Sequence, residues 1–293
     1  MKRIIDIMNA KKPIFSFEVF PPKTEKGLAS LYRAVEELAK LEPAYVSVTY
    51  GAGGSTSKAT LEIVTELQKR FGLVCMHHFT MVNATVAALR ESIARIRDAG
   101  CRNLLALRGD PPPEMGEKFL KIEGGLEYSY ELIDLIREVA GVDMGIGVAG
   151  FPEGHVDCPS KDLDSRYLRV KIDHGGQFAV TQLFFETPIY SEYLARTRAA
   201  GVTVPIVPGV LPIVDYGKLG KFCSTCGATI PQSVHDAFRP IAHEPEAMLK
   251  TGTEWAIAQC RDLLARGAPG IHFYCLNKVE PVRTIWKALA APR

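Results

Sequence analysis

One glutamate lies inside an apolar run near the start of the chain, in residues 14–20, IFSFEVF. Phe17, Val19 and Phe20 surround Glu18 along the chain, so its carboxyl is expected to be poorly solvated. Desolvation disfavours a charged carboxyl, and we therefore expect Glu18 to have a raised pKa and to act as a general acid near neutral pH. An interior glutamate that pairs structurally with a lysine or an arginine explains the residue equally well.

Polar residues follow several other apolar runs. Thr49 and Tyr50 lead into a glycine-rich segment, which lets a ligand approach the backbone closely. Arg108 and Asp110 enclose a glycine just before three prolines, and this rigid charged pair indicates a binding site. The segment Phe151-Pro-Glu-Gly-His155 also follows an apolar run. The same is true of Gln182, Tyr274, Asn277 and Lys278.

Paired histidines end another apolar run, at His77 and His78. Two adjacent histidines suggest a metal site, but adjacent residues of a strand point to opposite faces and cannot bind one ion together. Cys223 and Cys226 have the spacing of a zinc or redox pair, yet a zinc site needs a second pair of ligands. We interpret them as two thiols on an amphipathic helix and assign no metal.

The elements that must position these residues alternate along the whole chain. Short β-branched or aromatic runs are followed by longer runs of helical period. Eight nearly apolar strands, each followed by a helix, predict an α/β fold: a closed (β/α)₈ TIM barrel that forms a single domain over residues 1–293. A doubly wound open sheet is the alternative. The strands are expected at residues 14–20, 45–50, 73–80, 103–108, 144–151, 178–185, 205–211 and 271–276.

A barrel of this kind carries its chemistry where the strands end and the βα loops begin, so the polar residues named above should meet at one mouth. One extra helix is expected within residues 231–254, where the alternation is interrupted. Gly145, Gly147 and Gly150 match the pattern G-x-G-x-x-G, but they lie inside an expected strand and no helix opens after them. We therefore expect no Rossmann-type nucleotide site there.

Composition limits the function further. The 293 residues include 35 Lys and Arg against 33 Asp and Glu, a balance that does not favour a nucleic-acid partner or a membrane surface. No apolar run approaches the length of a membrane span, and Asp6 and Asn9 interrupt the N-terminal segment, which does not resemble a signal peptide. Seven cysteines, an odd number, favour reduced thiols. A cytoplasmic enzyme is the expectation.

Seven segments then give a resemblance, in order and over nearly the whole chain. They are residues 15–23 (FSFEVFPPK), 46–52 (VSVTYGA), 105–112 (LALRGDPP), 151–155 (FPEGH), 181–185 (TQLFF), 208–212 (PGVLP) and 272–277 (HFYCLN). Together they closely resemble the methylenetetrahydrofolate reductase family. The length is similar to that of the bacterial form, which is a catalytic barrel without the regulatory domain of the eukaryotic enzymes.

The resemblance implies a barrel that binds FAD and reduces 5,10-methylenetetrahydrofolate to 5-methyltetrahydrofolate with NADH or NADPH, in one-carbon metabolism that feeds methionine synthesis. It implies that Glu18 is the general acid, which protonates N10 of the folate so that the methylene bridge opens to an iminium. It also implies that Asp110 lies beside the flavin and the pterin. A carboxylate there disfavours the anionic reduced flavin and stabilises the iminium cation.

The resemblance assigns further residues to the two ligands. This sequence departs from the enterobacterial pattern at Phe151, where a tyrosine is usual, at Lys278, where an arginine is usual, and at Lys218, where a glutamine is usual. At position 278, an arginine could bind a carboxylate with two parallel hydrogen bonds, whereas the lysine offers a compact single charge. We expect this change to affect the affinity for the glutamate tail of the folate rather than the reaction. The residues implied for FAD are Thr49, Tyr50, Ala52, His78, Arg108, Gly109, Asp110, Ser129, Phe151, His155, Asp164, Tyr167 and Lys171. Those implied for the substrates are Glu18, Thr49, Asp110, Gln182, Lys218, Phe222 and Lys278.

Because one flavin face must serve both substrates in turn, ping-pong kinetics are expected. Two other functions remain open: a flavin-free barrel that binds a pterin for methyl transfer, and a reductase subunit that takes electrons from a partner protein. A homo-oligomer is expected, although the sequence does not indicate its size. The choice between NADH and NADPH is equally open, since the usual acidic ribose marker is missing.

Overall fold

The computed structural model describes residues 1–50, 57–110 and 119–290. Its strands are parallel and pair with one another around a ring. The sheet order is β7-β6-β5-β4-β3-β2-β1-β9-β8. The strands of this described part are β1 (Ile14–Val19), β2 (Tyr45–Val48), β3 (Cys75–Thr80), β4 (Asn103–Leu107), β5 (Gly145–Gly150), β6 (Phe178–Thr181), β7 (Ile206–Val207), β8 (Gly209–Val210) and β9 (Gly270–Tyr274).

The two end strands of that order, β7 and β8, are halves of one strand separated by Pro208, which has no N–H to donate. β7 pairs with β6, and β8 pairs with β9. The carbonyl of Pro208 still accepts the backbone N–H of His272 at 3.0 Å, so the pairing continues across the break. The sheet therefore closes into an eight-fold barrel, as predicted, and the open doubly wound sheet is excluded.

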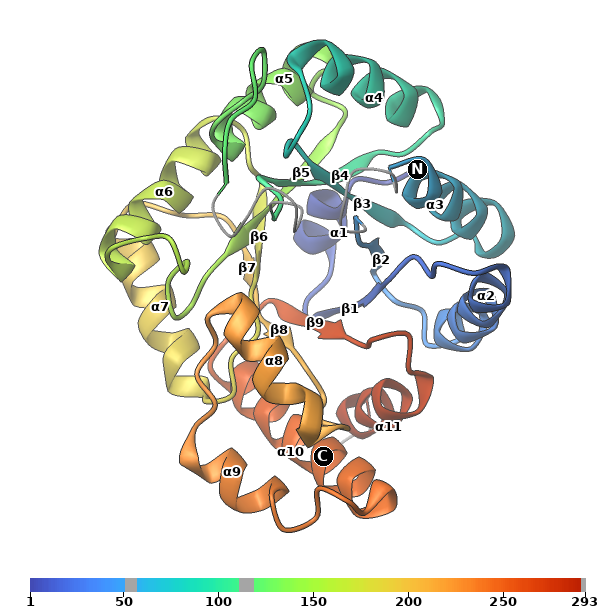
Figure 1. Ribbon diagram of the computed structural model, residues 1–293, viewed down its shortest axis with the longest axis vertical. Helices are drawn as coiled ribbons and strands as arrows, with labels where there is room; N and C mark the ends of the chain where they lie inside the picture. The colour runs from blue at the N-terminus through green and yellow to red at the C-terminus, as the bar shows by residue number, and fades with distance from the viewer. Residues whose placement is uncertain (51–56, 111–118, 291–293) are drawn as a thin grey trace.

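A ring of helices covers the outside of the sheet (Figure 1). Each connection from one strand to the next contains a helix, which confirms the predicted alternation. The ring consists of α2 (Glu25–Ala39), α3 (Ser57–Phe71), α4 (Val86–Asp98), α5 (Ser129–Ala140), α6 (Lys161–Asp173), α7 (Thr187–Ala199), α10 (Pro245–Ala265) and α11 (Val279–Ala290). Before α10, the connection also carries α8 (Tyr216–Cys226) and α9 (Gln232–Phe238), the second of which is the extra helix predicted within residues 231–254.

Side-chain caps fix the starts of several of these helices. The side-chain oxygens of Thr24, Thr85, Ser160 and Asp215 accept backbone N–H groups at the starts of α2, α4, α6 and α8. Such a cap satisfies one of the donors that the first turn of a helix leaves unpaired. Among the described helices, none combines the length and the apolar composition that crossing a membrane requires.

The floor of the barrel is formed by a helix that the sequence analysis missed, α1 (Ile4–Ala10). Figure 1 shows α1 within the ring of strands. Ile4 and Met8 are fully buried and pack against interior side chains at the start of the strands. Asn103, at the start of β4, ties this segment down: its Oδ1 accepts the N–H of Ile4 at 2.7 Å, and its Nδ2 donates to the carbonyl of Lys2 at 3.1 Å.

β6 is shorter than predicted because the apolar residues beyond it are buried for another reason. β6 ends at Thr181, and Leu183, Phe184 and Phe185 pack beneath helices instead of extending the sheet.

The glycines of β5 lie inside a strand, as expected, and leave room for neighbouring side chains. A Cβ on Gly147 would come within 2.7 Å of the Phe178 ring. This packing confirms the interpretation of these glycines as small residues of a barrel strand rather than as a nucleotide-binding motif.

Candidate active site

The Glu18 carboxyl lies inside the barrel, toward the ends of the strands, between two imidazoles. Its Oε2 is 3.3 Å from Nε2 of His78 on β3 and 3.6 Å from Nε2 of His272 on β9. All three side chains are buried. The sheet register explains the meeting, because Glu18 pairs with Tyr274 and Ser16 pairs with His272, so alternate residues of β1 and β9 face the same interior.

The predicted raised pKa of Glu18 is wrong for the ligand-free chain. Burial is the largest single contribution and raises the pKa, but His78 and His272 together outweigh it. The pKa of the Glu18 carboxyl is lowered to about 2. The sequence showed the apolar flanks of Glu18 along its own strand, whereas the imidazoles come from strands far along the chain.

Two serines also contact these imidazoles, Ser16 on the side of His272 away from Glu18 and Ser47 on the same nitrogen of His78 that faces Glu18. Ser16 Oγ lies 2.8 Å from Nδ1 of His272, and Ser47 Oγ lies 2.5 Å from Nε2 of His78. Ser16, Ser47 and His272 are site residues that were not predicted from the sequence. A signal was present for His272, because it is a polar residue inside an apolar strand, as Glu18 is. Hydroxyl, imidazole and carboxyl groups thus lie together around Glu18.

Aromatic rings complete the wall around His272. The ring of Tyr45 stacks on it at 5.7 Å, and the ring of Tyr274 meets it edge-on at 5.5 Å. The hydroxyl of Tyr274 donates to the carbonyl of Thr181 at 2.6 Å. Gly209 makes room for Tyr274, since a Cβ there would come within 2.5 Å of the ring. These contacts fix the His272 ring beside Glu18.

A second polar group lies where β4 and β5 end, and it contains several residues predicted to hold the cofactor. Arg108 Nη2 lies 2.5 Å from Oδ2 of Asp157, and its guanidinium carbon lies 5.1 Å from the centre of the Phe119 ring. The backbone N–H of Asp157 donates to Nδ1 of His155 at 3.1 Å. The ring of His155 meets Phe151 edge-on at 4.7 Å.

Lys171 and Asp164 extend this group from α6. Nζ of Lys171 donates to the carbonyl of Ala149 at 2.6 Å and lies 5.7 Å from the centre of the Phe151 ring. Burial lowers the pKa of Lys171 to about 8, against the opposing charge of Asp164. Burial also raises the pKa of Asp164, and Lys171 acts against that shift. Both ionisable groups thus lie at a desolvated place where a ligand could use them.

Lys218 and Phe222, predicted to contact the substrates, lie on α8, and Lys278, predicted for the folate tail, acts on the residue that caps this helix, Asp215. Lys218 Nζ lies 2.7 Å from Oδ2 of Asp215. The hydrogen bond from Lys218 is the main cause of the lowered pKa of Asp215, and the charge of Lys278 contributes. Phe222 lies one turn beyond Lys218 on the same helix and is partly exposed. Gln182 uses its Oε1 to accept the backbone N–H of Leu183 at 2.9 Å.

The other predicted residues fall around the same strand ends. Thr49 is buried, and its carbonyl accepts the hydroxyl of Thr60 at 3.0 Å. Gly109 has a left-handed φ of 89°, and a Cβ there would come within 2.9 Å of Thr80. Asp110 is exposed, and its charge acts on His155. Tyr50 is half-buried after β2, Ser129 begins α5, Tyr167 is exposed on α6, and Ala52 lies outside the described residues.

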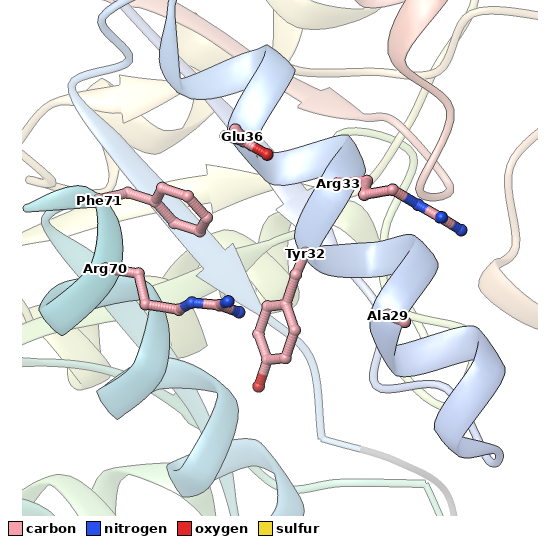
Figure 2. Close-up of a pocket in the computed structure, with 6 residues that line it drawn as sticks. All are labelled: Ala29, Tyr32, Arg33, Glu36, Arg70 and Phe71. Carbon is pink, nitrogen blue, oxygen red and sulfur yellow. The ribbon is translucent and has the colours of Figure 1, made fainter.

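A separate hollow of about 630 Å³ lies on the outside of the barrel, between α2 and α3. Figure 2 shows Arg70 and Phe71 of α3 facing Tyr32 of α2, with the guanidinium carbon of Arg70 4.9 Å from the centre of the Tyr32 ring. Arg33 and Glu36 of α2 also line it, so charges of both signs are present. Its walls are outer helix faces rather than strand ends, and the candidate active site is the mouth instead.

The chain is similar along almost its whole length to one family of proteins. The family model described as methylenetetrahydrofolate reductase matches residues 3–290. A 5,10-methylenetetrahydrofolate reductase of Pectobacterium carotovorum subsp. carotovorum is 34% identical over 265 residues, which cover 90% of this chain and 86% of the relative. Methylenetetrahydrofolate reductase (NADH) 1 of Arabidopsis thaliana is 36% identical over 284 residues, or 94% of this chain. These residues make up 48% of that relative, so the chain spans about half its length.

A solved structure also has this fold. It is an uncharacterized protein from Clostridium thermocellum, described as binding two copies of 5-methyl-5,6,7,8-tetrahydrofolic acid. The TM-score is 0.63 at 14% sequence identity, and the match covers 97% of this chain and 96% of the other. At this identity the likeness concerns the fold alone.

Proposed function

The chain belongs to the methylenetetrahydrofolate reductase family, and we propose that it reduces 5,10-methylenetetrahydrofolate to 5-methyltetrahydrofolate with FAD as cofactor and NADH or NADPH as electron donor. The observation that carries the proposal is the Glu18 carboxyl between His78 and His272. A buried carboxyl supports this reaction, because N10 must be protonated as the iminium forms and a positioned carboxyl can supply the proton.

The low pKa of Glu18 defines how the proton must move. In the ligand-free chain the carboxyl is ionised near neutral pH, so Glu18 cannot store the proton itself. The ring nitrogens of His78 and His272 lie 3.3 Å and 3.6 Å from Oε2, on the path by which a proton reaches the carboxyl. A substrate that covers the mouth excludes water and disfavours the ionised carboxyl, so that Glu18 takes up a proton. Glu18 then donates it to N10 of the folate.

The polar group at the ends of β4 and β5 fits FAD. Arg108 and Lys171 supply two cations for a diphosphate, and His155 supplies a ring N–H. The hydroxyl of Thr80, at the end of β3, is buried with no hydrogen-bond partner among the described residues, which leaves a polar atom for a ligand. When bound, FAD supplies the chemistry of hydride transfer between the nicotinamide and the folate. Asp110 follows β4 nearby and is proposed to stabilise the positive charge of the iminium.

The folate and the nicotinamide are proposed to occupy the same channel in turn, so that the kinetics are ping-pong. Gln182, at the end of β6, and Phe222, on α8, would contact whichever substrate is present. Lys218 and Lys278 both act on Asp215, so two cations lie in one corner, where the glutamate tail of the folate carries its carboxylates. A protein of the same fold is described as binding 5-methyl-5,6,7,8-tetrahydrofolic acid, which supports a folate as the substrate.

Anaerobic spectroscopy of the flavin tests the proposal. We expect a yellow protein that loses its colour with NADH or NADPH and regains it when methylenetetrahydrofolate is added. A colourless protein that takes up no FAD would favour the flavin-free methyltransferase, and a yellow protein that neither nicotinamide reduces would favour a subunit fed by a partner protein. Detection of an obligatory ternary complex would exclude the ping-pong order. A cytoplasmic location and a homo-oligomer stay predictions.

Lys171 gives the site a predicted pH dependence. The ammonium group is needed to attract the diphosphate, and in the ligand-free chain it loses its proton as the pH rises through about 8. We therefore expect the affinity for FAD to be constant below that pH and to fall above it, approaching about tenfold per pH unit. Titration of the protein with FAD on either side of this pH, followed by flavin fluorescence, measures the slope.

The matched control is Lys171→Arg, because a guanidinium stays charged throughout this range. The slope should disappear in this variant even if its affinity is lower overall. An unchanged slope in Lys171→Arg would assign the pH dependence to another group.

A further inference from the structure

Asp157 lies in the loop between β5 and α6 and contacts two residues proposed to hold FAD. Its Oδ2 lies 2.5 Å from Nη2 of Arg108, which follows β4. Its backbone N–H donates to Nδ1 of His155, in its own loop, at 3.1 Å. One residue thus joins an arginine from one strand end and a histidine from the next.

The Arg108 side chain is held on two sides. Asp157 binds one end of the guanidinium, and the Phe119 ring lies 5.1 Å from its central carbon. An arginine side chain carries about 2 kcal/mol of rotamer entropy, so fixing it in advance reduces what a ligand must order on binding. The remaining donors of the guanidinium then have a defined direction.

The contact with His155 decides which ring nitrogen carries a proton. Burial is the main cause of the lowered pKa of His155, the charge of Arg108 adds to it, and the charges of Asp157 and Asp110 oppose it, so the net shift favours the neutral ring. Because Nδ1 accepts the N–H of Asp157, the single ring proton is on Nε2. His155 therefore offers a donor on the side away from Asp157.

We propose that Asp157 is a positioning residue for the cofactor's phosphates: its carboxylate orients Arg108, and its backbone N–H orients His155, so that both present donors to one diphosphate. This inference rests on the proposed FAD-dependent function and adds to it a residue that itself need not touch the cofactor. Asp157 and Arg108 keep 50% and 31% of their side chains exposed. An ion pair this exposed contributes little to folding stability, so a role in stability alone does not account for it.

The test compares the affinity for FAD of wild-type protein, Asp157→Ala, Arg108→Ala and the double variant. We expect Asp157→Ala to bind FAD about tenfold more weakly, which corresponds to about 1.4 kcal/mol. Asp157→Ala should have little further effect in the Arg108→Ala background, since the carboxylate acts through Arg108. Riboflavin, which lacks the phosphates, should bind equally to wild type and Asp157→Ala.

Asp173→Asn is the matched control, because Asp173 forms an ion pair of similar exposure with Arg169 on α6, 2.6 Å long. Asp157→Glu should restore part of the affinity. Tighter binding of FAD by Asp157→Ala would show that the carboxylate competes with the ligand, and it would overturn the inference. An equal loss with riboflavin, or an equal loss in the Arg108→Ala background, would also overturn it.

Failure of the inference and failure of the proposed function are distinguishable. A wild-type protein that binds no FAD overturns both. A wild-type protein that binds FAD, with a variant of unchanged affinity, overturns only the role of Asp157.

Discussion

Glu18→Gln is expected to slow the reduction of methylenetetrahydrofolate by about 10²- to 10⁴-fold, the range that positioned proton transfer contributes, and to leave reduction of the flavin by NAD(P)H nearly unchanged. The amide keeps the shape of the side chain but cannot pass a proton to N10. Hydride transfer from the nicotinamide needs no proton at that place. Stopped-flow absorbance at the flavin band measures each half-reaction separately.

The control for this experiment is Glu91→Gln, an exposed glutamate on α4. It should leave both half-reactions at the wild-type rate. The melting temperatures of both variants check that the fold is retained. If Glu18→Gln slowed the two half-reactions equally, Glu18 would be a structural residue of the mouth and not the proton donor.

Asn103→Leu is expected to lower the free energy of unfolding by about 3 kcal/mol, because it removes the hydrogen bonds of a fully buried amide. Asn103 accepts the N–H of Ile4 and donates to the carbonyls of Lys2 and Cys75. Each buried polar group left without a partner costs about 1–3 kcal/mol. Urea unfolding followed by circular dichroism gives the change directly.

Asn9→Ala provides the comparison, since Asn9 lies on the same helix, α1, but is exposed. Its effect on stability should be small. Both variants should keep the wild-type ratio of the two half-reaction rates at a temperature where they are folded, because α1 closes the floor of the barrel and not its mouth. A loss of stability in Asn9→Ala equal to that in Asn103→Leu would contradict the anchoring role of Asn103.

The barrel itself could be predicted because its signal is local and repeated. Strands buried on both faces need apolar residues throughout, and the helices between them need apolar residues with a period near 3.6. Both patterns are visible in the sequence, and the structure confirms the alternation. α1 was missed because a segment of 7 residues is too short for its period to stand out. Its fixed position depends on Asn103, whose contacts with it cannot be found from local pattern.

The candidate site was predictable in its members but not in its electrostatics. Glu18, His78 and Arg108 were placed near strand ends by the sequence, and the structure places them there. The structure added His272 and Asp157, which the sequence analysis had not treated as site residues. The sign of the Glu18 pKa shift was wrong because flanking residues report burial alone, whereas the opposing charges come from other strands.

By itself, the sequence determined the alternation of strands and helices, the family and the strand ends at which the polar residues collect. Only the tertiary structure decided that Glu18 faces the interior and that His78 and His272 flank it within 3.6 Å. Periodicity depends only on residues that are near one another along the chain, so it can be read from the sequence alone. The charge state of a buried group depends on what closes around it in space, and that is set by the register of strands that are distant in sequence.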